Sequence, residues 1–282
     1  MIRITACQTK RGKSSERNLE ACVKWIEKIA QNERTDLICF GETYPFSFDI
    51  PGNLDEDKRV TLLKQVCRES RSSILIGYVE QAGDKIRNLA VLINQAGEII
   101  HRHAKDVKYG DEKQKLAPGS DKTQVVRYQG ANIGLSICYS LLFPEYGRML
   151  ALQGSQLVIA QSNVPSSIRD VWHSVLLTRV FENHLPYVHV SAFDERRDYS
   201  GLTCIITPPF TKAEEIQDPF EEGFITAALD LRKYAARRFA KAPEARGPEL
   251  FREGEYGPFL SELPENILEE LMKWYPTLRS ST

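Results

Sequence analysis

The sequence lacks any large excess of positive or negative charge. Its 37 Lys and Arg residues are matched by 38 Asp and Glu residues, so the formal net charge of the 282-residue chain is −1. Proteins that bind nucleic acids need a basic surface that neutralises phosphates. The basic run of Arg232-Lys233 and Arg237-Arg238 is short and typical of a solvated helix face. We therefore expect no nucleic-acid partner.

Long hydrophobic runs are missing as well. No window approaches the ~20 apolar residues that a helix needs to span a bilayer. The stretch from Met1 to Gln8 is too short and too polar for the apolar core of a signal peptide, and it favours a first strand instead. We expect no membrane partner and a cytoplasmic protein.

Closely spaced cysteine pairs are also absent. The six cysteines lie far apart, at positions 7, 22, 39, 67, 138 and 204, with no CxxC pair among them. This spacing argues against a zinc or disulfide framework and indicates reduced thiols in an intracellular protein. His101 and His103 are spaced like metal ligands on a strand, but no nearby carboxylate set completes a zinc site. We expect neither a metal nor a cofactor.

Residues 131–145 combine a strand, a cysteine and a helix start. Apolar residues alternate with smaller ones up to Ile137, a period of two that predicts a strand. The pattern breaks at Cys138, and Pro144 followed by a glutamate is typical of the first turn of a helix. This is the topology of a nucleophile elbow, which holds a reactive atom out of a sheet. The segment alone is weak support, because most free cysteines are buried and inert.

Strands and helices alternate along the chain in an order that occurs twice. We predict strands at 1–8, 36–40, 73–79, 87–93, 98–103, 131–137, 156–160, 187–192, 203–207 and 224–229, and helices at about 15–29, 55–69, 144–153 and 170–183. The repeat predicts two similar halves whose sheets pack face to face with helices outside, in one α/β domain at 1–240. The tail at 241–282 carries one amphipathic helix, which we expect to be an oligomer contact.

Three residues with reactive side chains directly follow predicted strands: Glu42, Lys105 and Cys138. A carboxylate near a thiol, with its pKa raised by burial, can act as general base. A lysine there lowers the pKa of the thiol and stabilises an oxyanion, for which the backbone N–H of Tyr139 is a natural second donor. Taken singly, Glu42 and Lys105 are better explained as solvated loop residues. Their combination with the elbow carries the catalytic interpretation.

The motifs around these residues resemble those of the carbon–nitrogen hydrolase (nitrilase) family, in its amidase-like branch, across nearly the whole chain. The matching segments are Ile4 to Gln8, Gly41 to Thr43 with Pro45, Gly97 to Lys105, Gly110 to Glu112 with Ala117 to Gly119, Ile133 to Tyr139 with Phe143 to Glu145, Arg179 to Asn183, and Gly247 to Phe251. Several ordered motifs at suitable spacing are a far stronger signal than one short pattern.

The resemblance implies a four-layer α-β-β-α sandwich with two mixed sheets and a Glu–Lys–Cys triad. Glu42 would be the general base and acid, Lys105 would stabilise the tetrahedral intermediate, and Cys138 would be the nucleophile that forms a thioester. Glu112 would orient and polarise the site from beside the lysine. The resemblance also implies that no metal is required. It further implies a homodimer or larger homo-oligomer, with the helices next to the elbow and the tail at its interface.

Two departures from the family pattern follow the cysteine: Ser140 and Leu142 stand where members commonly carry Asp and Arg. If that Asp and Arg pair with each other, losing both leaves no charge unpaired. Near the lysine, His103-Ala104 replaces an aromatic residue and an arginine, and Val107 replaces a histidine. These changes bear on the substrate class more than on the reaction.

We expect hydrolysis of a non-peptide C–N bond in a small amide or N-carbamoyl compound, with release of ammonia or an amine. Nitrile hydrolysis is disfavoured because Tyr139 stands where nitrilases proper more often have tryptophan. Acyl transfer, and a binding or regulatory protein that has lost turnover, are the alternatives. His173 is a candidate pocket residue, for which ordinary packing is equally expected, and Arg169 and Arg179 are candidates for contacting a substrate carboxylate.

Overall fold

Strands and helices alternate through two successive halves in the computed structural model, which describes residues 1–48, 50–119, 125–208 and 211–234. The first half comprises β1 (Ile2–Lys10), α1 (Ser15–Asn32), β2 (Leu37–Cys39), α2 (Lys58–Ser70), β3 (Ile74–Ala82), β4 (Lys85–Ile93), β5 (Ile99–Ala104) and α3 (Glu112–Lys115). The second half comprises β6 (Val125–Tyr128), β7 (Ala131–Ile137), the 3-10 helix η1 (Cys138–Leu142), α4 (Pro144–Leu152), β8 (Leu157–Ser162), β9 (Val164–Pro165), η2 (Ser166–Ile168), α5 (Arg169–Asn183), β10 (Tyr187–Phe193), η3 (Glu195–Arg197), β11 (Tyr199–Ser200), β12 (Cys204–Thr207), β13 (Thr211–Glu215) and β14 (Gly223–Leu229). The expected tail helix within 241–282, like the motif from Gly247 to Phe251, lies outside the described residues.

The two halves share one strand order and one set of strand directions. In the first half, β1, β2 and β3 are parallel and β4 and β5 follow antiparallel; β14, from the end of the second half, lies antiparallel beside β1. In the second half, β7, β8 and β10 are parallel, β12 and β13 follow antiparallel, and β6 lies antiparallel beside β7. Strand β1 is therefore equivalent to β7, and β2 to β8. This confirms the predicted pair of similar halves.

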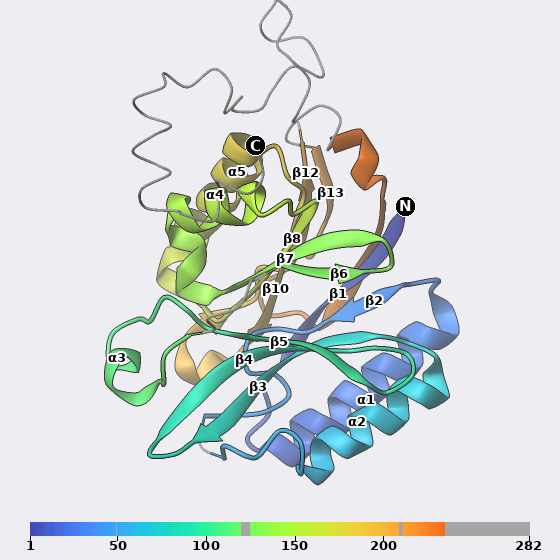
Figure 1. Ribbon diagram of the computed structural model, residues 1–282, viewed down its shortest axis with the longest axis vertical. Helices are drawn as coiled ribbons and strands as arrows, with labels where there is room; N and C mark the ends of the chain where they lie inside the picture. The colour runs from blue at the N-terminus through green and yellow to red at the C-terminus, as the bar shows by residue number, and fades with distance from the viewer. Residues whose placement is uncertain (49, 120–124, 209–210, 235–282) are drawn as a thin grey trace, which may run out of the picture.

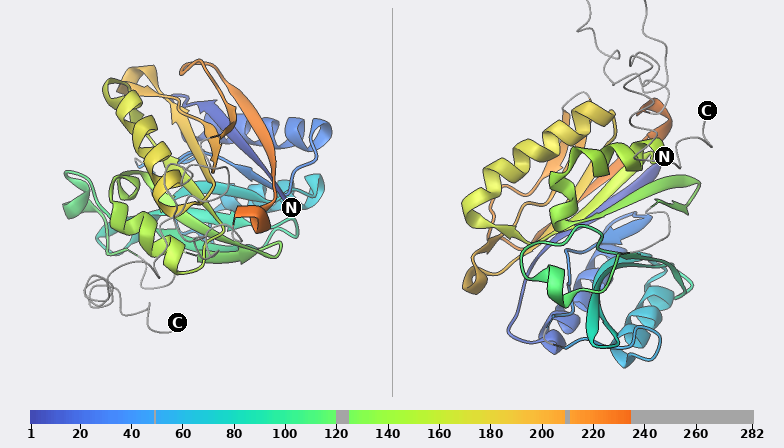
Figure 2. Two further views of the ribbon diagram at one scale, coloured as in Figure 1. Left: turned by 90° about the horizontal axis from the view of Figure 1, so that it is seen from above. Right: turned by 60° about the vertical axis from the view of Figure 1, so that its left-hand side comes forward.

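The two sheets pack face to face with helices on both outer sides, which confirms the predicted four-layer sandwich. Helices α1 and α2 cover the first sheet, and α4 and α5 cover the second (Figure 1, Figure 2). Side chains of both sheets meet in one buried cluster, with Ile4 and Leu75 from the first and Leu135 and Val190 from the second. Within the described ranges, no helix has the length and apolar character needed to cross a membrane.

One edge of the sandwich collects the residues that follow its central strands. Strand β1 pairs in parallel with β10 through Thr9↔Ala192 and Lys10↔Phe193, and this pairing joins the two sheets. Strands β1, β2, β7, β8 and β10 therefore all run in the same direction. In α/β proteins, ligands bind beyond the carboxyl ends of such strands. This shared strand-end edge is where the reactive residues lie.

Local sequence sets the helix ends. Ser14 caps α1 with its side chain, and Asp57 caps α2 in the same way, so α2 begins at 58 and not at 55 as we expected. Pro144 begins α4 as predicted, and Gly154 follows the end of that helix with a φ of 85°.

Besides the three 3-10 helices, five short elements were not predicted from the sequence: α3, β6, β9, β11 and β13. Each has only two to five residues. A segment of that length is too short to display a helical or strand period. Helix α3 also forms within a stretch rich in charge, proline and glycine that we expected to be a loop.

Candidate active site

Glu42, Lys105, Glu112 and Cys138, the four catalytic candidates of the sequence, come together at the shared strand-end edge. The Nζ atom of Lys105 lies 3.1 Å from Oε1 of Glu42 and 2.8 Å from Oε1 of Glu112. The thiol of Cys138 lies near enough to Glu42, Lys105 and Glu112 for all three charges to act on it. The candidates come from segments far apart in the sequence, so the fold itself builds this cluster.

A close approach of two backbones positions Glu42. The loop after β2 lies so near β3 that a Cβ atom at Gly77 would sit 2.0 Å from the backbone nitrogen of Thr43. A Cβ atom at Gly41 would lie 2.7 Å from the backbone nitrogen of Ala192 on β10. Only glycine fits at these two positions, and the loop that carries Glu42 is thereby pressed between neighbouring strands.

The carboxylate of Glu42 accepts four hydrogen bonds, two on each oxygen. Oε1 accepts from Lys105 and, at 2.8 Å, from the side-chain amide of Asn88 on β4. Oε2 accepts from the backbone N–H of Asn163 at 2.9 Å and from its side-chain Nδ2 at 2.8 Å. Glu42 is only 2% exposed, and this number of donors is what a buried carboxylate needs to stay ionised.

Lys105 is held between two carboxylates. It is 3% exposed, and its backbone N–H donates to the carbonyl of Asn88 at 2.8 Å. Glu112, in the first turn of α3, uses Oε1 to bind Lys105 and Oε2 to accept from the backbone N–H of Tyr109 at 2.8 Å. Both oxygens of Glu112 are therefore committed, and its charge is fixed beside the ammonium group, as the resemblance implied.

Cys138 sits on a strained turn between β7 and η1. Its φ is +49°, a left-handed conformation that L residues rarely adopt and that marks functional turns. The Sγ atom lies 4.0 Å from the carbonyl oxygen of Asn163. The other five cysteines are buried, whereas Cys138 is only partly buried. The strand–cysteine–helix geometry predicted for the elbow is thus present.

The cluster fixes the charge state of each group at rest. Burial alone would raise the pKa of Glu42, but Lys105, Asn88 and Asn163 outweigh burial and hold that pKa below its ordinary value. The expected rise was therefore wrong, because the hydrogen bonds were not visible in the sequence. Burial lowers the pKa of Lys105, but Glu42, Cys138 and Glu112 reverse this and raise it. Burial, together with Glu42, raises the pKa of the Cys138 thiol in spite of Lys105. At rest Glu42 is therefore a carboxylate, Lys105 an ammonium group and Cys138 a neutral thiol.

Tyr139 and His173, the two remaining candidates, lie in different parts of the structure. Tyr139 is the second residue of η1, where backbone N–H groups have no partner within the helix, so its amide is available beside the thiol. Its ring contacts Tyr109 and Phe143 edge-to-face, with centroids 5.1 and 5.2 Å away. His173 lies on α5 near the buried His189 of β10, and the contacts of the triad described above do not include it.

Arg179 holds the backbone of the elbow at η1. Arg179 of α5 donates to the carbonyls of Leu141 and Leu142, at 2.9 and 2.8 Å. Arg179 is thus engaged by the protein itself. Arg169, the other candidate for a substrate carboxylate, donates to the carbonyl of Gly201 at 3.0 Å.

A second buried network ties the lysine loop to the elbow helix. The hydroxyl of Tyr146 on α4 lies 3.2 Å from Nε2 of His103 and donates to Asp106 at 2.9 Å. Burial lowers the pKa of His103 to about 3, so this ring is neutral. Within the described ranges, no group of three or more His, Cys, Asp or Glu side chains is arranged to hold a metal ion.

Three residues of the site escaped the sequence reasoning: Asn88, Asn163 and Arg11. Asn88 is the buried polar residue of β4; it follows Lys85 and Arg87 in the polar start of the strand, so nothing in the sequence indicated its burial. Asn163 follows β8 as Glu42 follows β2, so the repeat of the two halves pointed to its position. Arg11 stands in the run Lys10-Arg-Gly-Lys13, which is typical of a solvated loop and carried no signal.

These groups suit attack of sulfur on a carbonyl carbon. Glu42 can take the thiol proton of Cys138 as the sulfur attacks, since its carboxylate is the charge that acts most strongly on the thiol. The ammonium of Lys105 and the N–H of Tyr139 are placed to stabilise a developing oxyanion. The geometry thus brings together a thiol, a carboxylate and an ammonium group, which are the types of group that such an attack needs.

Comparisons with known proteins identify the family of the chain. The sequence model of the family described as carbon-nitrogen hydrolase matches residues 3–239. A probable nitrilase of Schizosaccharomyces pombe is 24% identical over 250 residues, covering 83% of this chain and 91% of the relative. The 2-oxoglutaramate amidase of Bacillus subtilis is 26% identical over 238 residues, covering 80% of this chain and 89% of the relative.

Solved structures of the same kind share the fold. A mutant of the amidase of Nesterenkonia sp. AN1, which carries the acetamide moiety of fluoroacetamide on its active-site cysteine, is similar with a TM-score of 0.72 and 21% identity. The similarity covers 83% of this chain and 92% of that chain.

Proposed function

The chain belongs to the carbon–nitrogen hydrolase family and is an amidase-type hydrolase, and we propose that it cleaves a non-peptide C–N bond in a small amide or N-carbamoyl compound through a thioester on Cys138. The observation that carries this proposal is the position of one buried carboxylate, Glu42, which pairs with the ammonium of Lys105 at 3.1 Å and whose charge acts on the thiol of Cys138. A base, a nucleophile and a cation close together are what acyl transfer to sulfur requires.

In the first step Glu42 takes the proton of the Cys138 thiol while Sγ bonds to the substrate carbonyl carbon. The carbonyl oxygen becomes an oxyanion, which Lys105 and the N–H of Tyr139 stabilise. Glu42 then gives its proton to the leaving nitrogen as the C–N bond breaks. Ammonia or an amine departs, and the acyl group stays on sulfur as a thioester.

In the second step water completes the hydrolysis. Glu42, again a carboxylate, takes a proton from a water molecule whose oxygen bonds to the thioester carbon. Collapse of this second tetrahedral intermediate breaks the C–S bond, and the proton on Glu42 returns to sulfur. The products are the carboxylic acid, or a carbamate that decomposes, and the free enzyme.

Two named amidases and the residue after the cysteine support the amide class. The Bacillus subtilis relative is a 2-oxoglutaramate amidase, and the Nesterenkonia amidase carries the acetamide moiety of fluoroacetamide on its active-site cysteine. Tyr139 stands directly after Cys138, where nitrilases proper more often have tryptophan. We assign this chain to small amides and N-carbamoyl compounds for these reasons.

The test is the intact mass of the protein after brief incubation with small amides, N-carbamoyl amino acids and nitriles, followed with ammonia release. We expect an added acyl mass on the wild type and on Cys67→Ala, which removes a buried thiol of α2, but not on Cys138→Ala. A Cys138→Ala protein that still turns over the same substrate would overturn the triad. A wild type with no adduct and no ammonia across the panel would favour a binding protein that has lost turnover.

We also propose that the protein acts as a homodimer or larger homo-oligomer. Large apolar side chains are exposed beside the elbow: Phe143 is 36% exposed, Phe181 on α5 45% and Val171 on α5 61%. Exposed apolar side chains gathered on one side of a protein mark interaction surfaces. This location agrees with the interface implied by the family resemblance.

A further inference from the structure

Arg11 is a buried cation that lies next to the base of the proposed triad. It is the first residue after β1, is 8% exposed, and faces the loop of Glu42 at the shared strand-end edge. Arg11 directly follows β1 as Cys138 directly follows β7, and both lie at the shared strand-end edge. Arg11 contacts the carbonyl of Glu42, and Cys138 contacts the carbonyl of Asn163, the equivalent residue of its own half.

The guanidinium group holds the backbone of the Glu42 loop. Nη2 donates to the carbonyl of Glu42 at 2.8 Å and to the hydroxyl of Thr43 at 3.2 Å. Nη1 donates to the carbonyls of Phe46 at 2.9 Å and Thr43 at 3.3 Å. One planar group therefore binds the backbone carbonyls of three residues, Glu42, Thr43 and Phe46. The point charge of a lysine cannot bind all three in this way.

The same group also sets the orientation of the Asn163 amide. Nη2 of Arg11 lies 3.4 Å from Oδ1 of Asn163, and Nδ2 of Asn163 donates to Oε2 of Glu42 at 2.8 Å. A guanidinium group only donates hydrogen bonds, so it accepts only the oxygen end of the amide as its partner. The nitrogen end must then face Glu42. Without Arg11, Asn163 is free to rotate and to present its oxygen to Glu42, which favours the protonated carboxyl.

We propose that Arg11 is a positioning residue for Glu42: it fixes the backbone of the Glu42 loop and the orientation of the Asn163 amide, and so keeps Glu42 ready to accept a proton. This inference rests on the proposed role of Glu42 as the base. Arg11 acts through Glu42 and Asn163 and does not itself contact the reacting atoms.

Electrostatics act in the same direction as geometry. The charged and titratable groups around Glu42 are Arg11, Lys105 after β5, Cys138 at the elbow, Glu112 on α3 and Tyr199 on β11. Burial lowers the pKa of Arg11, while the Glu42 charge counteracts this, so the two groups stabilise each other's charged forms. Loss of Arg11 is expected to raise the pKa at which the Glu42–Cys138 pair gains a proton.

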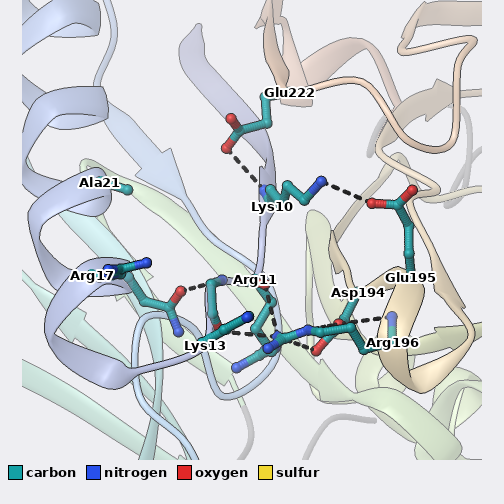
Figure 3. Close-up of a pocket in the computed structure, with 11 residues that line it drawn as sticks. Lys10, Arg11, Lys13, Arg17, Ala21, Asp194, Glu195, Arg196 and Glu222 are labelled. Carbon is teal, nitrogen blue, oxygen red and sulfur yellow. Dashed lines mark hydrogen bonds and ion pairs between the residues drawn. The ribbon is translucent and has the colours of Figure 1, made fainter.

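A cavity of about 410 Å³ gives access to Arg11 from solvent (Figure 3). Its lining includes Arg11, the exposed residues Lys13 and Arg17 from the start of α1, and Arg196, which donates to the carbonyl of Arg11 at 3.1 Å. A small guanidinium ion can therefore reach the space that the Arg11 side chain would vacate. This makes the proposal testable by chemical rescue.

The primary readout is the alkylation of Cys138 by iodoacetamide between pH 5 and 9, followed by intact mass. It needs no substrate, and the other five cysteines are buried. In Arg11→Ala we expect the pH of half-maximal alkylation rate to rise by about one unit and the rate at pH 7 to fall roughly tenfold, since a charge-assisted hydrogen bond is lost. Arg17→Ala, from the same cavity, should match the wild type.

Two further measurements separate positioning from a general effect on the fold. Guanidinium chloride at about 20 mM, against sodium chloride at equal ionic strength, should restore the rate of Arg11→Ala and leave Arg17→Ala unchanged. In a Glu42→Gln background, Arg11→Ala should cause no further change in the pH profile, because the two residues act in series. Arg11→Gln, which retains an amide donor, serves if the alanine variant does not fold.

The proposal is overturned if Arg11→Lys equals the wild type, if guanidinium gives no rescue, or if Arg11→Ala and Glu42→Gln act additively. These outcomes are distinct from failure of the proposed hydrolysis. An enzyme that forms no acyl adduct with any substrate can still show the alkylation profile that reports on Arg11 and Glu42.

Discussion

Glu42 and Asn163 occupy the same position in the two halves of the fold, and their side chains hydrogen-bond to each other at 2.8 Å between Oε2 and Nδ2. One half thus contributes an anion after its second strand, and the other contributes a donor that stabilises this anion. The two halves share one backbone arrangement, but the side chains that they carry at this position are different and complementary.

This contact predicts that Asn163→Asp inactivates the enzyme more than its small change in shape suggests. A second carboxylate beside Oε2 of Glu42 would force one of the two to bind a proton, as like charges in contact do. We expect kcat/KM at pH 7 to fall roughly 100-fold and its acid limb to move to higher pH. Asn53→Asp, at an exposed position, is the control and should leave both unchanged. An unaltered acid limb in Asn163→Asp would contradict the prediction.

Glu112→Gln tests the second carboxylate on Lys105. Glutamine keeps the shape of Glu112 and its acceptor for the Tyr109 N–H, but it removes the charge that lies 2.8 Å from the ammonium. We expect kcat/KM to fall roughly tenfold to 100-fold with little loss of melting temperature, because Lys105 loses its alignment but keeps Glu42. Asp111→Asn, one residue earlier and exposed, should behave as wild type in the same assay.

His103 makes stability depend on pH. The pKa of His103 is about 3 in the folded protein and about 6.5 in the unfolded chain. Below pH 6.5 the unfolded chain therefore binds a proton at this residue, whereas the folded protein does not. The free energy of unfolding should fall by about 2 kcal/mol between pH 7.5 and pH 5 from this group alone. Urea unfolding of His103→Gln at both pH values should show a smaller drop than the wild type. An equal drop in both proteins would assign the effect elsewhere, for example to the buried His189.

The proposed oligomer is testable at α5. Replacing Val171 or Phe181 by Asp places a charge on the exposed apolar surface beside the elbow and should dissociate the assembly in light scattering after size-exclusion chromatography. Leu62→Asp, at a residue of α2 that is 41% exposed, is the matched control and should keep the wild-type mass. A wild type that is monomeric at micromolar concentrations would refute the proposal directly.

Much of the fold could be predicted because its elements are long and periodic. The alternation of apolar runs and amphipathic helices indicated two similar halves, and a proline and a glycine marked the ends of α4. The short strands β9 and β11 could not be predicted, because two residues have no period and pair only once the surrounding loops have folded. The late start of α2 depended on which of several acidic residues became its cap, and the structure assigns that role to Asp57.

Residues of the candidate site that lie in recognisable sequence motifs could be predicted. Residues whose role depends on being buried could not. Glu42, Lys105 and Cys138 were visible because each follows a strand in a family-like motif. Arg11 was not, because a basic run gives no sign that one of its members will be buried against backbone carbonyls. The direction of the Glu42 pKa shift failed for the same reason: burial was foreseen, but the donors that outweigh it come from β4 and from the residue that follows β8.

The distance along the chain between the partners of the site also governs when the protein becomes reactive. Glu42 and Asn163 are 121 positions apart and meet only after both sheets have formed and docked. During synthesis, Cys138 therefore leaves the ribosome before the group that orients its base. A nascent or half-folded chain contains a thiol without an organised base beside it, and reactivity appears only as the last long-range contacts form. The division of the site between two halves thus delays chemistry until folding is complete.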